Sequence, residues 1–223
     1  MRQMWVWMLL MALAFVNDRS HCCLDEERIS LLEIKAWFNH AGAPGSYYLD
    51  GWGKEHFNCC NWDWVVCDNT TNRLIELDLS YVNYDGLNAV EDLDLNASLF
   101  LPFKELEILD LSANQLVGGL KNQGFQLLVS RLRQFEELDL SDNKFNDSIL
   151  SSLSGFSTLK SLDLSSNMFI GSTGLNGLRK LETLYLDSTD FMESILIGSL
   201  GTLPSLKTLH ASDSNFKHFG KGQ

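Results

Sequence analysis

The sequence is short of the features that point to enzyme chemistry or to flexible linkers. It holds three prolines, no run of like charge and no low-complexity segment, so it predicts no linker between domains. No G-x-S-x-G, H-E-x-x-H or glycine-rich phosphate loop occurs, and His40, His56, His210 and His218 are not spaced as metal ligands. The sequence therefore predicts neither an enzyme nor a cofactor.

Basic residues are scarce as well. Lys and Arg number 17 against 29 Asp and Glu, which gives a formal net charge of −12. Nucleic acid and anionic membrane surfaces attract basic proteins and repel acidic ones. Neither is expected as a partner of this chain.

Long apolar runs are limited to one, from Met4 to Val16, which follows the positive charge of Arg2. Its 13 residues fall short of the roughly 20 that span a bilayer, but they suit the core of a signal peptide. We expect cleavage between Asn17 and Cys23; an uncleaved signal anchor is the alternative. The chain is then either a secreted protein or an ectodomain whose membrane anchor is missing from this chain.

Leucine, in contrast, is abundant and recurs in a pattern. Leu159, Leu162, Leu164 and Asn167 occupy positions 1, 4, 6 and 9 of an L-x-x-L-x-L-x-x-N unit. Six units share the apolar positions, and their position-4 residues are Leu77, Leu109, Leu138, Leu162, Leu184 and Leu209. The intervals of 32, 29, 24, 22 and 25 residues are typical of the leucine-rich repeat.

Each residue type in the repeat has a physical reason. In the L-x-L pair both leucines point to one side of a short strand, into the solenoid. The Asn side chain can satisfy backbone groups where the strand turns, and coils must stack because one coil cannot bury its own apolar face. The expected fold class is α/β: a leucine-rich repeat solenoid with a parallel β-sheet on its concave face. Short helices, 3-10 turns and loops should form the convex face.

The repeat pattern divides the chain into a signal peptide, an N-terminal cap, six coils and an uncapped tail, at residues 1–22, 23–72, 73–216 and 217–223. Residues 81–102 widen the first interval, and we interpret them as an insertion on the loop side, although Leu93–Asn96 resembles a strand. The second long interval leaves room for a convex helix over Phe125–Leu132. An uncapped tail should leave Leu203, Leu206 and Leu209 uncovered.

The cap carries a helix and a cluster of cysteines. Asp25–His40 is predicted to be helical, with Asp25 as its N-cap. Cys59, Cys60 and Cys67 could form a zinc site with His56, but the paired C-x2-C spacing of such sites is missing, and secretion favours disulfides. Adjacent cysteines bridge poorly, so Cys23–Cys59 with Cys60–Cys67, or the crossed pairing, remain.

A family resemblance emerges from this block. Cys23-Leu24-Asp25-Glu26-Glu27-Arg28, Trp52 and Cys59-Cys60-Asn61-Trp62-Asp63-Trp64-Val65-Val66-Cys67 resemble the N-terminal cap of plant extracellular leucine-rich-repeat proteins. With its repeats, the chain is similar over residues 1–216 to plant receptor-like proteins, which have an ectodomain and a membrane anchor but no kinase. The resemblance implies the pairs Cys23–Cys59 and Cys60–Cys67.

The chain also departs from that family. Its members usually carry many more repeats, a cysteine-containing C-terminal cap and a transmembrane helix. Their L-x-G-x-I-P segment is degenerate here and lacks its proline at residues 116–120, 145–149 and 191–195.

The resemblance also implies a function. It indicates a non-catalytic recognition module at the cell surface, on the extracellular side of the plasma membrane, in defence or developmental signalling. Its ligand would be an extracellular peptide, protein or glycan, and its signal would pass through a co-receptor kinase. The alternative is a soluble inhibitor of a cell-wall hydrolase, secreted to the apoplast, as the polygalacturonase-inhibiting proteins are.

The outward-facing strand positions are the candidate binding residues. They follow Asp78 in one column: Asp110, Asp139, Asp163, Tyr185 and His210. Serines at 80, 112, 141, 165 and 212 are expected beside them on the same concave face. The column either selects a basic or polar ligand or is merely a solvated strand face. We favour the second interpretation for the aspartates and the first for Tyr185 and His210.

Three sequons are candidate N-glycan acceptors on surface loops. They begin at Asn69, Asn96 and Asn146.

Overall fold

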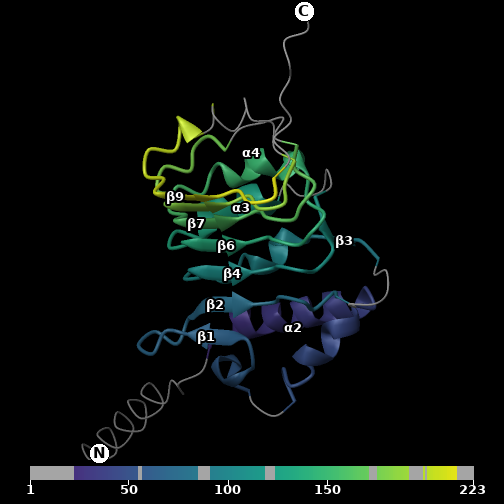
Figure 1. Ribbon diagram of the computed structural model, residues 1–223. Coiled ribbons are helices and arrows are strands. Elements are labelled where there is room, and N and C mark those ends of the chain that lie inside the picture. Colours follow the sequence, from purple (N-terminus) through teal and green to yellow (C-terminus); the bar gives the residue numbers. More distant parts are fainter. Residues whose placement is uncertain are drawn as a thin grey trace, which may run out of the picture.

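The computed structural model describes residues 23–54, 57–84, 91–118, 124–170, 175–190, 198 and 200–214. Over these ranges the chain forms a stack of coils on a helical cap (Figure 1). One seven-stranded sheet runs through the stack in the order β1-β2-β4-β6-β7-β8-β9. This confirms the predicted solenoid. The expected signal peptide and the tail 217–223 lie outside the described residues.

The strands of this sheet are short, because each coil contributes only the segment that lies on its concave side. Their bounds are β1 Val65–Cys67, β2 Leu74–Asp78, β4 Ile108–Asp110, β6 Glu137–Asp139, β7 Ser161–Asp163, β8 Thr183–Tyr185 and β9 Thr208–His210. All neighbours from β2 onward pair in parallel, whereas β1 pairs antiparallel with β2. The position-4 leucines lie side by side from coil to coil, as the repeat spacing predicts.

The core of the stack is a column of leucines and phenylalanines. The leucines at positions 1, 4 and 6 are buried from β2 to β8, and aromatic rings such as Phe135 and Phe156, 5.2 Å apart between centroids, fill the space behind them. In the last described coil Leu209 is 37% exposed, but Leu203 is only 4% exposed. The expectation that Leu203, Leu206 and Leu209 would all be uncovered was wrong for Leu203, which belongs to the buried core, and Leu206 is half-buried against that core.

Buried or half-buried asparagines join three of the coils to the coil before them, as the repeat predicts. Asn114, Asn143 and Asn167 each donate from Nδ2 to three backbone carbonyls, at least one of which belongs to the preceding coil. The Oδ1 atoms accept backbone N–H groups, for example from Asn114 and Leu116 onto Asn143 at 3.1 and 2.9 Å. The buried turn therefore keeps its backbone polar groups paired.

The residue before each asparagine position adopts a left-handed conformation. The φ angles lie between 51° and 60° at Tyr81, Ala113, Asp142, Ser166, Ser188 and Asp213. These positions repeat at the intervals of the coils. Every coil thus has a left-handed residue in its turn, and every coil except the first, where Val82 occupies the asparagine position, follows it with a buried or half-buried polar side chain.

The convex side carries helices and a second, smaller sheet. The helical segments are η3 Ala97–Phe100, α3 Gly124–Arg131, η4 Asp147–Ile149 and α4 Leu150–Leu153, and α3 confirms the predicted convex helix. The interpretation of residues 81–102 as a plain loop insertion was incomplete. Within it β3 Leu93–Asp94 is a true strand, which pairs in parallel with β5 Leu116–Val117 beyond the asparagine turn.

The cap closes one end of the stack. It comprises α2 Asp25–His40, η1 Pro44–Leu49, η2 Cys59–Asn61 and β1. Asp25 is the first helical residue rather than the cap: Leu24 holds the N-cap position, and no side chain caps the helix. Disulfides join Cys23 to Cys59 and Cys60 to Cys67, with Cα–Cα distances of 5.7 and 5.5 Å. These are the pairs that the family resemblance implies.

A buried ion pair fixes the cap to the first coil. Glu27 of α2 is fully buried, and its carboxylate accepts from Nε of Arg73 at 2.8 Å and from the backbone N–H of Leu74 at 3.4 Å. Arg73 also pairs with Glu105 at 3.5 Å. Burial raises the pKa of the Glu27 carboxyl despite the neighbouring guanidinium. The cap and the repeats are thus one packed unit.

Among the described helices, none combines the length and the apolar character that crossing a bilayer requires.

Candidate functional site

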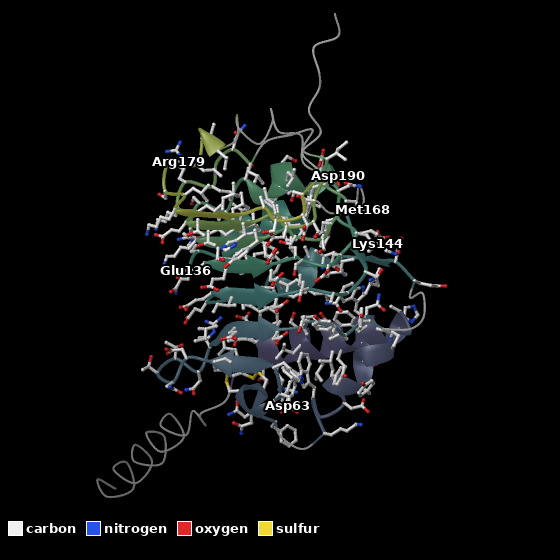
Figure 2. The ribbon with its side chains drawn as sticks, in the orientation of Figure 1. Asp63, Glu136, Lys144, Met168, Arg179 and Asp190 are labelled. Carbon is white, nitrogen blue, oxygen red and sulfur yellow. A yellow bond between two sulfur atoms is a disulfide. The ribbon has the colours of Figure 1, made fainter. Side chains whose placement is uncertain are left out.

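The concave sheet brings the predicted binding residues into one column. The strand register aligns Asp78 with Asp110, then Asp139, Asp163, Tyr185 and His210. Figure 2 shows the direction of the coils: Glu136, just before β6, lies at one edge of the stack, and Lys144, beyond the turn, lies at the other. Strand alternation turns the column away from the leucine core. All five predicted concave-face residues are therefore brought together.

The aspartates of the column have a local structural role. Asp78, Asp110, Asp139 and Asp163 each accept, through Oδ1, the backbone N–H of the serine two residues later, at 2.8–2.9 Å. The bond helps the chain to leave the strand. The L-D-L-S sequence thus stabilises the turn in these four coils, a role that the solvated-face interpretation did not include.

Burial also makes the carboxyl groups of Asp110 and Asp139 reluctant to ionise. It raises the pKa of Asp110 and raises that of Asp139 to about 6, with a smaller contribution from the like charges of neighbouring aspartates. The serine N–H bonds act in the opposite direction. A cation placed on this face would relieve the repulsion, so the column favours a basic partner over an acidic one.

Tyr185 and His210 interrupt the aspartate column at its far end. Their rings are stacked, with centroids 4.4 Å apart and an interplanar angle of 9°. Tyr185 is half-buried, and His210 is exposed. Neither ring belongs to the leucine core, so the pair offers a flat aromatic surface to the concave side.

A shallow hollow connects the two parts of the column. It has a volume of about 300 Å³, and its lining includes Asp110, Asp139, Asp163 and Tyr185. It is open to solvent and extends over several neighbouring strands. Such a surface suits an extended ligand that crosses several coils.

The serine column was only partly placed as predicted. The strands end at the aspartates, so the serines stand just past them, and Ser112 and Ser165 are buried rather than displayed. Ser165 instead accepts, through Oγ, the backbone N–H of Asp187 at 3.1 Å. These serines mainly support the turn.

The remaining predicted sites lie on the surface or in the cap. Asn69, Asn96 and Asn146 are exposed, and their glycosylation stays a prediction. The sulfurs of Cys59, Cys60 and Cys67 are committed to disulfides, while His56 lies outside the described residues. Within the described ranges no group of three or more potential metal ligands is gathered.

One feature was missed by the sequence reasoning. Between the cap and the first coil lies a hollow of about 260 Å³, walled by Tyr48, Trp64 and Tyr81 with Asp78 beside them. The tyrosines and tryptophans are visible in the sequence, but they stand far apart along the chain. Only folding brings them together.

The family comparisons agree with this architecture. The "Leucine rich repeat N-terminal domain" model matches residues 24–68, and the "Leucine Rich repeat" model matches residues 133–154 and 157–178. The first match covers the disulfide-bonded cap, and the second covers the coils of β6 and β7.

Two curated relatives are a plant receptor and a plant receptor-like protein. The chain is 34% identical to Cuscuta receptor 1 of Solanum lycopersicum over 212 residues, which is 87% of this chain and 18% of the relative. It is 35% identical to Receptor-like protein 14 of Arabidopsis thaliana over 182 residues, 78% of this chain and 18% of the relative. The chain thus spans about a fifth of the length of these relatives.

Among solved structures, the ectodomain of the Arabidopsis receptor kinase HAESA, in complex with an IDA peptide hormone ligand, is similar. The TM-score is 0.54 at 26% identity, over 84% of this chain and 34% of that one. The cap, the coils with their asparagine turns and the receptor relatives point the same way. The chain belongs to the leucine-rich-repeat proteins and groups among them with the plant receptor-like proteins.

Proposed function

We propose that this chain is an extracellular ligand-recognition module of a plant receptor-like protein and has no catalytic activity of its own. Its membership of that family and its open concave sheet support the proposal. Solenoids use this face for binding because it is large and its side chains are free of core packing. The module would act on the extracellular side of the plasma membrane.

The stacked pair of Tyr185 and His210 is the observation that carries the proposal. A half-buried tyrosine on a binding face is the kind of residue that dominates the free energy of association, because its ring is large and has few rotatable bonds. The stacking of His210 at 4.4 Å holds the tyrosine ring in place before a ligand arrives. We expect this pair to anchor one end of the ligand.

The ligand class follows from the charges of the column. Burial opposes the ionisation of carboxyl groups such as that of Asp139. A cationic partner therefore gives these groups the largest stabilisation of their ionised form. An extended peptide with basic residues would fit the face from Tyr185 to Asp110. Since receptors of this family lack a kinase, we also propose that the bound state is read by a separate co-receptor kinase.

The test begins with the secreted, disulfide-bonded chain. A phage-displayed library of random peptides is panned on residues 23–223, and a retained peptide is then titrated by surface plasmon resonance. Tyr185→Ala should weaken its binding by about 2 kcal/mol, or roughly thirtyfold. Phe57→Ala is the control, because Phe57 is 88% exposed and lies in the cap.

A second variant separates steering from anchoring. Asp110→Asn retains the acceptor for the Ser112 N–H but removes the charge, so it should slow association and reduce its salt dependence. An alanine would be less suitable: Asp110 bonds to its own turn and does not simply face solvent, as the sequence reasoning assumed. Equal effects of Tyr185→Ala and Phe57→Ala on binding would contradict the proposed anchor.

The alternative, a soluble inhibitor of a cell-wall hydrolase, has a separate readout. The same protein would then lower the activity of a polygalacturonase in a reducing-sugar assay. If the protein inhibits the enzyme and the peptide library yields no binder, the function would belong to the inhibitor class.

A further inference from the structure

The hollow between the cap and the first coil stands at one end of the concave column. Its lining comprises Tyr48, Leu49, Trp64, Asp78, Ser80, Tyr81 and Val82. Asp78 ends β2 and is aligned with Asp110 of the next strand. Figure 1 shows β1 and β2 together at the cap end of the sheet, several strands away from the β8 strand that holds Tyr185. Because Asp78 both lines the hollow and belongs to the aspartate column, the hollow adjoins the face proposed for binding.

The walls of the hollow are fixed by backbone contacts. On the cap side, the N–H of Gly45 in η1 donates to the carbonyl of Val82 at 2.9 Å. A Cβ at Gly45 would lie 2.6 Å from the carbonyl oxygen of Tyr81, so only glycine allows η1 to approach this closely. On the other side, the N–H of Asp78 donates to the carbonyl of Trp64 at 3.0 Å. The hollow is therefore formed before any ligand arrives.

Two of its aromatic residues have a backbone conformation that bulky side chains rarely adopt. The φ angle is 69° at Trp64 and 60° at Tyr81. The other coils place small or polar residues at the position of Tyr81, namely Ala113, Asp142, Ser166, Ser188 and Asp213. The turn itself thus needs no aromatic ring, and such strain tends to be retained where a residue has a functional role.

The rings are also displayed rather than packed away. Trp64 and Tyr81 are each 51% exposed, and Tyr48 is 46% exposed. By contrast, Trp52 and Trp62 of the same cap are 2% and 5% exposed. The cap therefore has two kinds of aromatic residue, one that builds its core and one that faces the hollow.

The charge of the site indicates what it binds. The Oδ1 atom of Asp78 accepts the Ser80 N–H at 2.9 Å, while no ion pair joins Asp78 to a basic residue in the described part of the chain, and neither Lys nor Arg lines the hollow. A carboxylate beside exposed aromatic faces attracts cations, both by its charge and by cation–π interaction. An acidic ligand would meet the repulsion of Asp78 and Asp110 together.

We propose that this hollow binds the guanidinium or ammonium group of an Arg or Lys side chain in an extracellular basic peptide. Asp78 is the counter-ion, and Trp64 and Tyr81 are the aromatic faces. The proposal rests on the proposed recognition function in its choice of a peptide ligand, but it uses different residues from the Tyr185 anchor. It makes the cap a part of the binding surface as well as an end cover.

Trp64 itself provides the reporter. The experiment follows the indole N–H resonances of ¹⁵N-labelled residues 23–223 by NMR, with Trp64 assigned through Trp64→Phe. The probe is N-acetyl-Gly-Arg-Gly-amide, and its matched neutral form carries citrulline in place of Arg. We expect the Arg peptide to move the Trp64 resonance, and the citrulline peptide to bind about tenfold more weakly, which corresponds to 1.4 kcal/mol.

Two matched variants test the role of the carboxylate. Asp78→Asn keeps the acceptor for Ser80 and should abolish the preference for Arg over citrulline. Asp142→Asn, which removes an exposed carboxylate that does not line the hollow, should retain most of it. Unchanged indole resonances of Trp52 and Trp62 establish that Asp78→Asn is folded.

Several outcomes would overturn the proposal. Equal binding of the Arg and citrulline peptides would show that charge has no role, and a Trp64 resonance that stays fixed at tens of millimolar peptide would show that the hollow is not a cation site. Movement with cellobiose but not with the Arg peptide would assign it to glycans instead. The Tyr185→Ala variant should leave this titration unchanged, so the two proposals fail independently.

Discussion

Replacing Asn143 by alanine should be among the most damaging single changes in the repeats. The side chain is buried and makes five hydrogen bonds, all to backbone groups. Alanine leaves those groups in place and removes their partner. The cost then depends on which of the five groups have a second partner.

Each of the three carbonyl groups has a second hydrogen-bond donor. Those of Leu111, Leu140 and Ser141 also accept from Asn114, Asn167 and the N–H of Ala113, respectively. The N–H groups of Asn114 and Leu116 have no second acceptor among the described residues. Two buried donors without a partner cost about 1–3 kcal/mol each, so we expect Asn143→Ala to lower the free energy of unfolding by about 3–5 kcal/mol.

The matched control is Thr189→Ala, at the corresponding position two coils later. The Thr189 hydroxyl makes one bond, to the carbonyl of Leu186 at 2.6 Å, so its loss should cost about 1 kcal/mol. Denaturant unfolding of residues 23–223, followed by circular dichroism, measures both. If Asn143→Ala costs no more than Thr189→Ala, the asparagine does not satisfy the turn in the way described. Asn143→Asp adds a check, because it retains the acceptor but turns a carboxylate toward three carbonyls.

Three further predictions concern the cap and the concave face. Arg73→Ala leaves the fully buried Glu27 carboxylate unpaired and should cost about 3–5 kcal/mol in denaturant unfolding, whereas Lys104→Ala, which breaks the exposed pair with Glu26, should cost less than about 1 kcal/mol; similar costs would show that burial of the pair is unimportant. The pKa of Asp139 is raised in the folded state from 3.8 to about 6, so its protonated form stabilises the fold below the ordinary value, and that stability is lost as the pH rises through about 6. Asp139→Asn should therefore flatten this part of the pH profile of unfolding, and an unchanged profile would contradict the raised pKa. Mass spectrometry after alkylation without reduction should find Cys23, Cys59, Cys60 and Cys67 unlabelled, and a labelled cap cysteine would contradict the pairing.

Several details of the candidate site could not be predicted from the sequence because they depend on how far a strand extends. L-D-L-S alternation assigns Asp and Ser to the same face, but the chain already turns after Asp110. The Ser112 N–H then bonds back to Asp110, and the serine side chain becomes buried. The short strand Leu93–Asp94 was missed as a pairing element for a similar reason, since its partner Leu116–Val117 follows in the next coil. Local patterns do not specify such partners.

The sequence by itself determined the coil. Leucines at positions 1, 4 and 6 and a polar residue at position 9 specify a strand and a buried turn, and their spacing aligns Asp110, Asp139, Asp163, Tyr185 and His210 before any coordinates are known. Periodicity is sufficient there because each coil packs only against copies of its own pattern.

The tertiary structure alone decided how the cap meets the coils. Glu27 and Arg73 stand 46 residues apart in the chain, and the hollow of Tyr48, Trp64 and Tyr81 joins three separate segments. Neither arrangement recurs in another coil, so no spacing in the sequence predicts it. The shifted pKa of Asp139 is likewise a product of burial by neighbouring coils. Contacts that occur only once, between different elements, depend on how surfaces pack and exclude water. Such contacts cannot be predicted from the spacing of residues along the chain.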